Sequence, residues 1–320
     1  MEIEKNYFFN GNTKVVDGVT LKQIECEMYG VGGWIESESN LAQEGECWVS
    51  DDAMVYGNAK VYENAKVYGA AKICDNAKVH MDAEVGDEAM VFDYADIYCS
   101  AKVLGNAKVC GYAQVFGSAE LYNNANVSGY AKVLGDVKMY NNAVVSKNSF
   151  IYGDAVLDGN ARVSGNAHIS DCAHITGNAV ICGCPMIFGD AVVCDNAIVY
   201  GNPYIYGKAK VSGDAEVYGA ANVYGYAKVY GNAQVYDNAK VCGSKIFCDA
   251  KVYGNAKIGN GANVSGKAEV YGDAVVCRKA MVYGNARVYD YARVSGNAII
   301  CGNTNLCGFK IVCGNTIMDD

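Results

Sequence analysis

Long apolar runs are absent from this chain. Of its 320 residues 51% are hydrophobic, yet no run approaches the roughly 18 apolar residues that a membrane-spanning helix needs. The chain opens on Met1-Glu2-Ile3-Glu4-Lys5, without the basic and apolar leader that is typical of secretion. We therefore expect a soluble protein with many short buried segments and no membrane partner.

Most of the chain has nearly equal numbers of acidic and basic residues. The formal net charge is −9, and residues 1–50 account for −6 of it with nine acids and three lysines. The remainder is nearly neutral, whereas a protein that imitates DNA would need acid along its length, because duplex DNA carries about one charge per 1.7 Å. A basic stripe is missing too, so we expect no nucleic-acid partner.

Cysteine is plentiful but shows no disulfide pattern. Its 15 residues are an odd number and lack the spacing of a small disulfide-rich scaffold. Reduced thiols are typical of the cytoplasm, so we expect the protein to be cytoplasmic.

A six-residue repeat fills most of the chain. From Val49 to Val241 every sixth residue is Val, Ile, Leu or Met, which makes 33 positions without an interruption. Four residues after each of these comes a second restricted position, which is Ala at 28 of 32 places. The exceptions are Val137, Ser149, Pro185 and Pro203.

The repeat changes its step near the end of the chain. One residue is missing between Val241 and Ile246, after which the six-residue step continues to Leu306. A second five-residue step then predicts Ile311 and Ile317 as the last inward residues.

A period of six does not fit a helix face, which repeats every 3.6 residues, but it fits a short strand followed by a corner. In residues 59–62 (Ala-Lys-Val-Tyr), strand alternation puts the Ala and the Val on one side and the Lys and the Tyr on the other. The two remaining positions, such as Gly57-Asn58, hold residues that tolerate positive φ. Each hexad therefore predicts one wall and one corner, and the walls must wrap and stack to bury their aliphatic side.

This hexad, [Val/Ile/Leu]-x-x-x-Ala-x, resembles the repeat of hexapeptide-repeat proteins. The resemblance implies an all-β fold, a left-handed parallel β-helix (a triangular solenoid of about 15 coils, each of about 18 residues) over residues 35–320. Residues 32–49 look like the entry segment of a YdcK-like group of phage and bacterial proteins, which has no settled activity. A phage-encoded, host-directed inhibitor is one function that this resemblance leaves open.

Residues 1–34 lack the hexad and predict a capping segment. Alternating apolar residues over 13–16 and 19–24 flank Asp17-Gly18, a pattern typical of a β-hairpin with a tight turn. Because the end of a solenoid exposes unpaired strand edges, we expect this hairpin to cover one.

Steps of 18 residues, or 17 across the missing residue, align outward side chains on one face. One such ladder consists of Tyr200, Tyr218, Tyr236, Tyr253, Tyr271 and Tyr289. Another consists of Tyr62, His80, Tyr98, Phe116, Leu134 and Tyr152, continued by Ser170, Phe188, Tyr206 and Tyr224. Neighbouring aromatic residues on a sheet stabilise one another, so we interpret both ladders first as stabilising features. The alternative interpretation is that they form a binding surface.

The position before each aliphatic residue is usually Lys, Glu, Asn or Gln, but it is mostly apolar from Val144 to Tyr204. On one face four successive coils then carry outward pairs. The pairs are Phe150 with Tyr152, His168 with Ser170, Met186 with Phe188, and Tyr204 with Tyr206. Because outward apolar patches of this extent mark interfaces, we expect these residues to bind a protein partner or a second copy of the chain, the latter in a symmetric homo-oligomer.

An enzymatic alternative follows from the resemblance. Many hexapeptide-repeat proteins are acyltransferases in which a histidine between subunits is the general base and acyl-CoA lies along the coils, and His168 and His174 are the candidates here. Those enzymes usually carry loops and a C-terminal helix, and the long uninterrupted repeat has neither. Zinc binding is disfavoured, because His168 and His174 fall on adjacent walls.

The cysteines suggest no metal site either. Cys182 and Cys184 point to different sides of one corner, and Cys301, Cys307 and Cys313 fall on successive walls, so neither set converges on tetrahedral geometry. The sequence thus predicts a non-enzymatic β-helical scaffold or protein-interaction module without a cofactor, with the acyl-CoA-dependent acyltransferase as the alternative.

Overall fold

The computed structural model describes residues 7–320. These residues form β-strands and one short 3-10 helix, η1 (Glu38–Asn40), and none of their helices is long and apolar enough to cross a membrane. The chain divides into two compact units, the first Met1–Asp154 and the second Ala155–Asp320. Each unit is a β-solenoid, and together they make about 16 turns, close to the 15 coils expected from the repeat.

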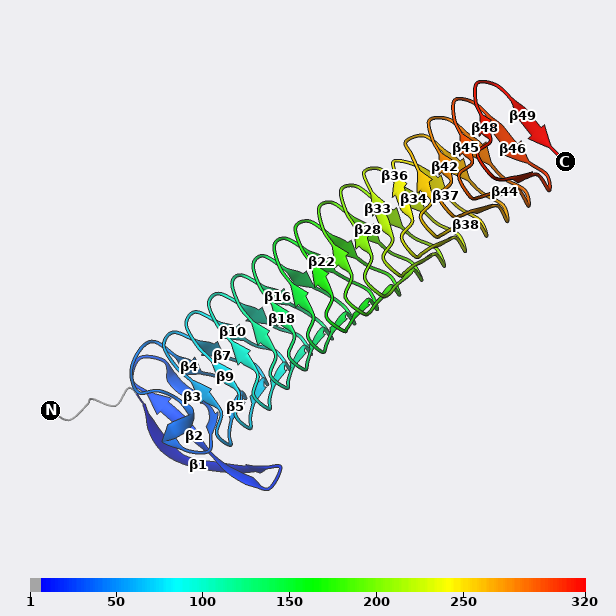
Figure 1. Cartoon of the computed structure of the whole chain (residues 1–320). Coiled ribbons are helices and arrows are strands. Elements are labelled where there is room, and N and C mark those ends of the chain that lie inside the picture. Colours follow the sequence, from blue (N-terminus) through cyan, green and yellow to red (C-terminus); the bar gives the residue numbers. More distant parts are fainter. Residues whose placement is uncertain (1–6) are drawn as a thin grey trace. The chain divides into compact units, whose positions relative to one another are not determined.

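The predicted N-terminal hairpin is confirmed. Strand β1 (Phe8–Val16) pairs antiparallel with β2 (Val19–Cys26), and Val16 faces Val19 across the turn (Figure 1, dark blue). Both turn residues have positive φ, 52° at Asp17 and 80° at Gly18, which is the backbone of the tight hairpin turn that the sequence favours.

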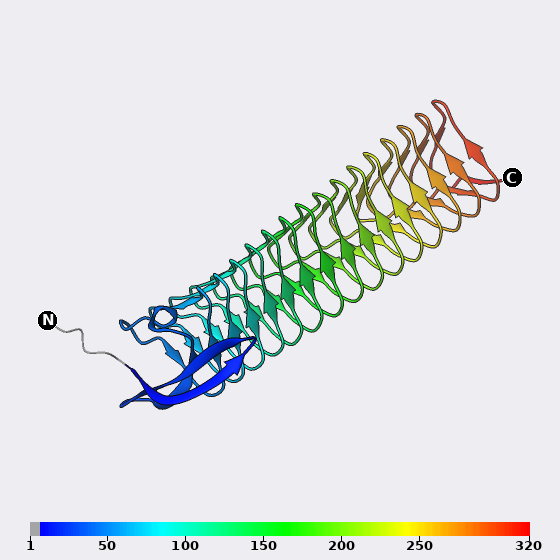
Figure 2. The same cartoon turned by 90° about the horizontal axis from the view of Figure 1, so that it is seen from below.

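The hairpin covers the edge of the first solenoid strand. Strand β3 (Gly30–Ile35) pairs antiparallel with β2 on one side and parallel with β5 (Met54–Val55) on the other (Figure 2). The predicted boundary after residue 34 therefore falls inside β3, and residues 1–6 of the predicted capping segment lie outside the described residues.

In the first unit, a strand of two residues starts every six residues from β4 (Trp48–Val49) to β21 (Phe150–Ile151). Each strand as far as β18 (Lys132–Val133) pairs in parallel with the third strand after it, so that Val49 lies beside Val67 and Val61 beside Val79. Three sheets result, which we call face A (β5, β8 and onward), face B (β6, β9 and onward) and face C (β4, β7 and onward).

The second unit repeats this pattern. Strands start every six residues from β22 (Val156–Leu157) to β36 (Lys240–Cys242) and again from β37 (Lys245–Ile246) to β49 (Ile317–Asp319). All have two residues except β33 (Asn222–Tyr224), β36, β46 (Ile299–Cys301) and β49, which have three. Its faces A, B and C begin with β23 (Arg162–Val163), β24 (His168–Ile169) and β22.

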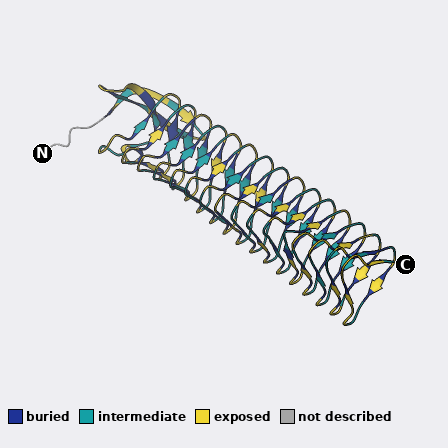
Figure 3. Ribbon diagram, turned by 90° about the horizontal axis from the view of Figure 1, so that it is seen from above, coloured by how far each residue is buried: buried dark blue, intermediate teal, exposed yellow. Residues whose placement is uncertain are grey.

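Both restricted positions of the hexad point inward, as predicted. Val103 and Ala101 have no exposed surface, while Lys102 between them faces outward, and Figure 3 shows this alternation of burial along the strands. The four exceptional residues of the Ala position, Val137, Ser149, Pro185 and Pro203, are buried as well.

The corners have left-handed backbone conformations and are stabilised by hydrogen bonds to the next coil. Asp87 has a φ of 59° and its carboxylate accepts a hydrogen bond of 2.8 Å from the backbone N–H of Gly105, the equivalent residue one coil later. Gly105 itself has a φ of 71°, a conformation that glycine adopts without strain. Asparagines one position further on form rungs of their own, as in the 2.9 Å bond from Asn178 Nδ2 to Asn196 Oδ1.

The missing residue between Val241 and Ile246 is confirmed, because β36 and β37 still bury both residues. The second five-residue step is wrong. Val312 lies inward with 8% of its surface exposed, whereas Ile311 and Ile317 point outward with 69% and 65% exposed. The register is set by the preceding coil, which places Val312 beside Val294, so the six-residue step from Leu306 continues unchanged.

Because the Ala position is buried, we predict that a larger side chain at this position destabilises the fold. Ala215 is fully buried, so we expect Ala215→Leu to lower the free energy of unfolding by about 1–3 kcal/mol, because a packed interior has no room for the added atoms. Urea denaturation measures this loss. Lys210→Leu, at an exposed position of β31 (Lys210–Val211), is the control and should stay within about 0.5 kcal/mol of wild type; equal losses in both variants would contradict the inward assignment.

Candidate functional site

The predicted tyrosine ladder forms on face A of the second unit. Its six rings stack in consecutive pairs, with centroid distances from 4.6 Å (Tyr200 to Tyr218) to 4.9 Å (Tyr271 to Tyr289) and interplanar angles of 6° or less. Each tyrosine follows the inward residue of its strand, so successive coils place it at the same point of the face. The stacking covers the faces of the rings within the ladder.

The ladder shifts the acidity of its phenols. Burial, reinforced by the neighbouring phenols of Tyr236 and Tyr200, raises the pKa of Tyr218 to about 12. Burial and the nearby carboxylate of Glu269 raise the pKa of Tyr253 further, and the Tyr253 hydroxyl donates a 3.2 Å hydrogen bond to Glu269 Oε2. The ladder therefore favours neutral phenols.

This shift predicts a loss of stability in alkali. Because the pKa of Tyr218 is higher in the folded chain than the value of about 10 in an unfolded one, its contribution is complete below pH 10 and is lost as the pH rises towards about 12. We expect Tyr218→Phe to reduce the fall in unfolding midpoint between about pH 9 and pH 12.

Urea denaturation at several alkaline pH values measures this fall. Tyr226→Phe is the matched control, because Tyr226 is 69% exposed and lies at a corner outside the ladder. A fall that is as steep in Tyr218→Phe as in wild type would contradict the assignment.

One of the predicted apolar pairs lies in the first unit and the other three lie in the second. In the first unit, Phe150 and Tyr152 lie on β21 and just after it, with ring centroids 5.0 Å apart. In the second unit, His168, Met186 and Tyr204 start successive strands of face B and lie side by side. In the row beside them Phe188 stacks on Tyr206 at 4.9 Å.

Burial differs among these residues. Tyr204 is 42% exposed, and Met186, Phe188 and Tyr206 are half-buried with outward side chains. Ser170 is only 6% exposed, so its side chain contributes little to the surface that its place in the ladder predicts.

The two candidate histidines are not brought together. His168 starts β24 on face B and His174 starts β25 (His174–Ile175) on face C, and both are exposed. They point to different sides of one coil, so they cannot share one substrate or metal ion, and the general-base role of either residue stays a prediction.

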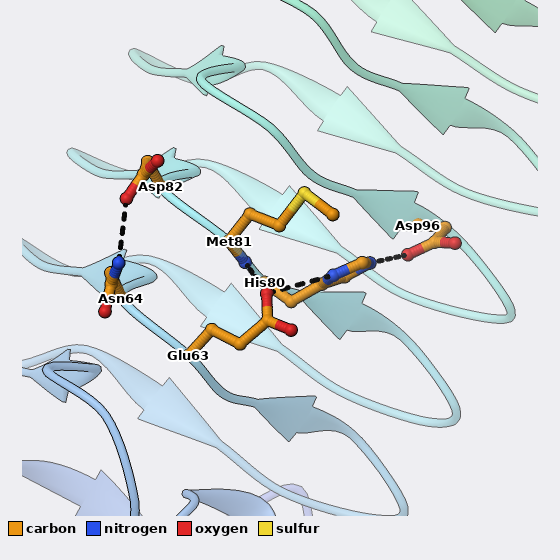
Figure 4. A network of polar contacts seen from close by, with 6 residues as sticks. All are labelled: Glu63, Asn64, His80, Met81, Asp82 and Asp96. Atoms are coloured by element: carbon orange, nitrogen blue, oxygen red, sulfur yellow. Dashed lines mark hydrogen bonds and ion pairs between the residues drawn. The ribbon is translucent and has the colours of Figure 1, made fainter.

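The sequence places a third histidine, His80, between Tyr62 and Tyr98 in a ladder, but it does not reveal the two carboxylates that contact the imidazole. His80 follows β9 (Lys78–Val79) on face B of the first unit, between the rings of Tyr62 at 4.6 Å and Tyr98 at 5.2 Å. Its Nε2 lies 3.1 Å from Asp96 Oδ1 and its Nδ1 lies 3.7 Å from Glu63 Oε2 (Figure 4). Both nitrogens of the imidazole thus face carboxylates from the coils before and after it.

The same carboxylate holds the backbone beside His80. Glu63 Oε2 accepts a 2.8 Å hydrogen bond from the N–H of Met81, and Asn64 donates a 3.0 Å bond to Asp82 in parallel with it (Figure 4). These residues line an open hollow of about 750 Å³. Burial and, second, the charge of Asp96 raise the pKa values of Tyr62 and Tyr98. These contacts, which we call the clasp around His80, connect three successive coils through side chains.

Two variants separate the roles of the His80 ring. His80→Phe keeps a flat ring between the tyrosines and loses both carboxylate contacts, so we expect a loss of about 1 kcal/mol in the free energy of unfolding. His80→Ala also removes two stacked pairs and should cost about 1–3 kcal/mol more. Urea denaturation at neutral pH measures both, and a His80→Phe chain as stable as wild type would show that the carboxylates contribute nothing.

The cysteines form no disulfide bonds. All 15 are free thiols, and burial raises the pKa of both Cys47 and Cys74 to about 11, which keeps them protonated. Among residues 7–320, no group of three or more His, Cys, Asp or Glu side chains is placed to hold a metal ion.

Comparison with known proteins agrees with the repeat. Residues 280–296, around β43 (Met281–Val282) and β44 (Arg287–Val288), match the family model described as YdcK β-solenoid repeat. Residues 280–296 therefore carry a YdcK β-solenoid repeat. The YdcK-like resemblance, which residues 32–49 indicate, is thus confirmed at another part of the chain, residues 280–296. No curated protein matches the chain.

Two solved structures are similar to this chain. One is a UDP-N-acetylglucosamine acyltransferase from Campylobacter jejuni, at 16% identity and a TM-score of 0.31, covering 55% of this chain and 68% of that one. The other is a UDP-N-acetylglucosamine acyltransferase from Arabidopsis, at 14% identity and a TM-score of 0.20, covering 74% of this chain and 69% of that one. Likeness of this degree says nothing of the activity of this chain.

Proposed function

We propose that the protein is a non-enzymatic β-solenoid scaffold whose second unit binds another protein through face B, with a second copy of the chain as the occupant. The observation that carries the proposal is a double row of apolar side chains. Met186 and Tyr204 form one row, and Phe188, Tyr206 and Tyr224 form the row beside it.

The composition of the rows supports binding rather than stabilisation alone. The position held by Met186 and Tyr204 contains lysine on other strands, as in the neighbouring pair Lys210 and Lys228 of face C. Lys210 and Lys228 keep this position polar on solvated strands, whereas Tyr204 leaves 42% of an aromatic side chain exposed to water. An exposed aromatic and apolar cluster of this kind favours contact with another protein.

Charged side chains border the double row. Lys208 lies 4.0 Å from Asp190 and 5.8 Å from the ring of Tyr226, at the corner that follows face B. A polar rim around an apolar centre is typical of protein interfaces.

The spacing of the rows favours a second copy as the occupant. The rings of Phe188, Tyr206 and Tyr224 repeat every 4.9 to 5.1 Å, because each belongs to one coil. Another coil surface of the same chain has the same spacing, so a two-fold pair brings every rung opposite a rung. A globular partner matches such a repeat only by chance.

The oligomeric state tests this proposal. We expect wild type to be a dimer by light scattering, and Met186→Lys with Phe188→Lys to be a monomer, because each copy would bury two added charges without partners. The matched control is Ser212→Lys with Gln234→Lys, which adds two lysines at half-buried outward positions of other faces and should remain dimeric. A monomeric wild type, or a dimer that survives the face B substitutions, would overturn the self-association.

A further inference from the structure

A second surface of interest lies in the first unit, where the hairpin segment meets the first coils. An open hollow of about 490 Å³ is lined by the aromatic side chains of Tyr29, Trp48 and Tyr68. Its polar lining consists of Glu46, Ser50, Asp51 and Lys66. Its size and its aromatic walls with a few polar groups are typical of small-molecule sites.

The aromatic walls are held in place by backbone that leaves room for them. Tyr29 and Trp48 have ring centroids 5.3 Å apart at an angle of 36°. The backbone N–H of Tyr29 donates a 3.0 Å hydrogen bond to Cys26 Sγ, which fixes the turn between β2 and β3. A side chain at Gly32 would meet the Trp48 ring at 2.6 Å, so glycine there is what admits the indole.

The third wall is positioned in the same manner. The ring of Tyr68 occupies the space that a side chain at Gly86, one coil later, would take. Asp51, which also lines the hollow, accepts hydrogen bonds of 3.0 Å from the N–H of Gly69 and 3.2 Å from the hydroxyl of Ser50. Tyr68 and Asp51 therefore belong to the hydrogen-bonded coils, whereas Tyr29, which is 50% exposed, and Glu46 lie outside the repeat.

The charges of the lining select the class of ligand. Two carboxylates accept hydrogen bonds, while Lys66 donates them and Ser50 does both. Lys66 opposes an organic cation, which three aromatic rings would otherwise suit, and Glu46 with Asp51 opposes a phosphate or another anion. A neutral ligand that carries many hydroxyl groups on an apolar carbon ring satisfies every part of this lining.

We propose that this hollow binds a neutral oligosaccharide. The apolar face of one sugar ring packs on Trp48 and Tyr29, and the hydroxyls around its edge meet Glu46, Asp51 and Lys66. The site is independent of the face B rows, which lie in the second unit.

Fluorescence tests the proposal directly, because the chain has only 2 tryptophans. Trp34→Phe leaves Trp48 as the reporter, and this variant is titrated with maltotriose and with cellotriose. We expect a saturable change in emission for at least one of them, with a Kd of about 1 mM. Calorimetry of the same sugars with the wild-type chain repeats the measurement without any substitution, should Trp34→Phe disturb the fold.

Two further variants locate the binding. Tyr29→Ala should weaken it by about tenfold or more, because this ring lies in a turn and forms one wall of the hollow. Tyr94→Ala is the matched control, because Tyr94 is 53% exposed, close to the 50% of Tyr29, but stacks on Tyr112 elsewhere in the unit. This variant should leave the Kd unchanged.

Three results would overturn the proposal. The first is the absence of saturable binding of either sugar to the wild-type chain. The second is an equal loss in Tyr29→Ala and Tyr94→Ala. The third is saturable binding of tetramethylammonium without binding of the sugars, which would identify the hollow as a cation site.

Discussion

The backbone hydrogen bonds between one coil and the next determine which side chains lie together on the outer faces of each solenoid unit. The N–H of Lys60 donates to the carbonyl of Ala77 and the N–H of His80 donates to that of Ile97, at 2.9 and 3.0 Å, and the same bonds recur at each later coil within a unit. Because this register never varies, a side chain always lies beside its equivalent one coil away. Outward residues therefore interact in columns, and the composition of a column decides whether it stabilises the fold or exposes a surface.

This constraint explains why the inward and outward residues serve different purposes. The inward Val and Ala positions are buried throughout and provide the packing, so they leave little freedom for variation. Outward positions tolerate many residues, and columns of different chemistry follow one another along the coils. The tyrosine column of face A, the apolar rows of face B and the clasp around His80 are three results of one architecture.

Much of this arrangement could be predicted from the sequence, because the period of the repeat is the period of the fold. The inward positions, the hairpin at Asp17-Gly18 and the order of rings in the ladders follow from counting residues. Ile311 and Val312 could not be separated in this way, since two adjacent aliphatic residues both suit the inward position and only pairing with Val294 decides between them.

The rest of the candidate sites depends on contacts that a period does not describe. Glu63 and Asp96 reach His80 from positions 17 and 16 residues away, so they belong to different columns. Tyr29 meets Trp48 only because the turn after β2 folds back over the first coil, and that turn lies outside the repeat. Counting by hexads finds side chains that share a column, and it misses those that meet across columns or across the end of the repeat.

The 18-residue spacing has an evolutionary consequence. A stretch such as 210–227 starts and ends at equivalent points of the second unit, since Lys210 pairs directly with Lys228. Its duplication or excision would lengthen or shorten the solenoid by one whole turn and return every later residue to the face it occupied before. Genes of this kind can thus acquire new length by recombination between repeats, while the chemistry of each wall is inherited intact.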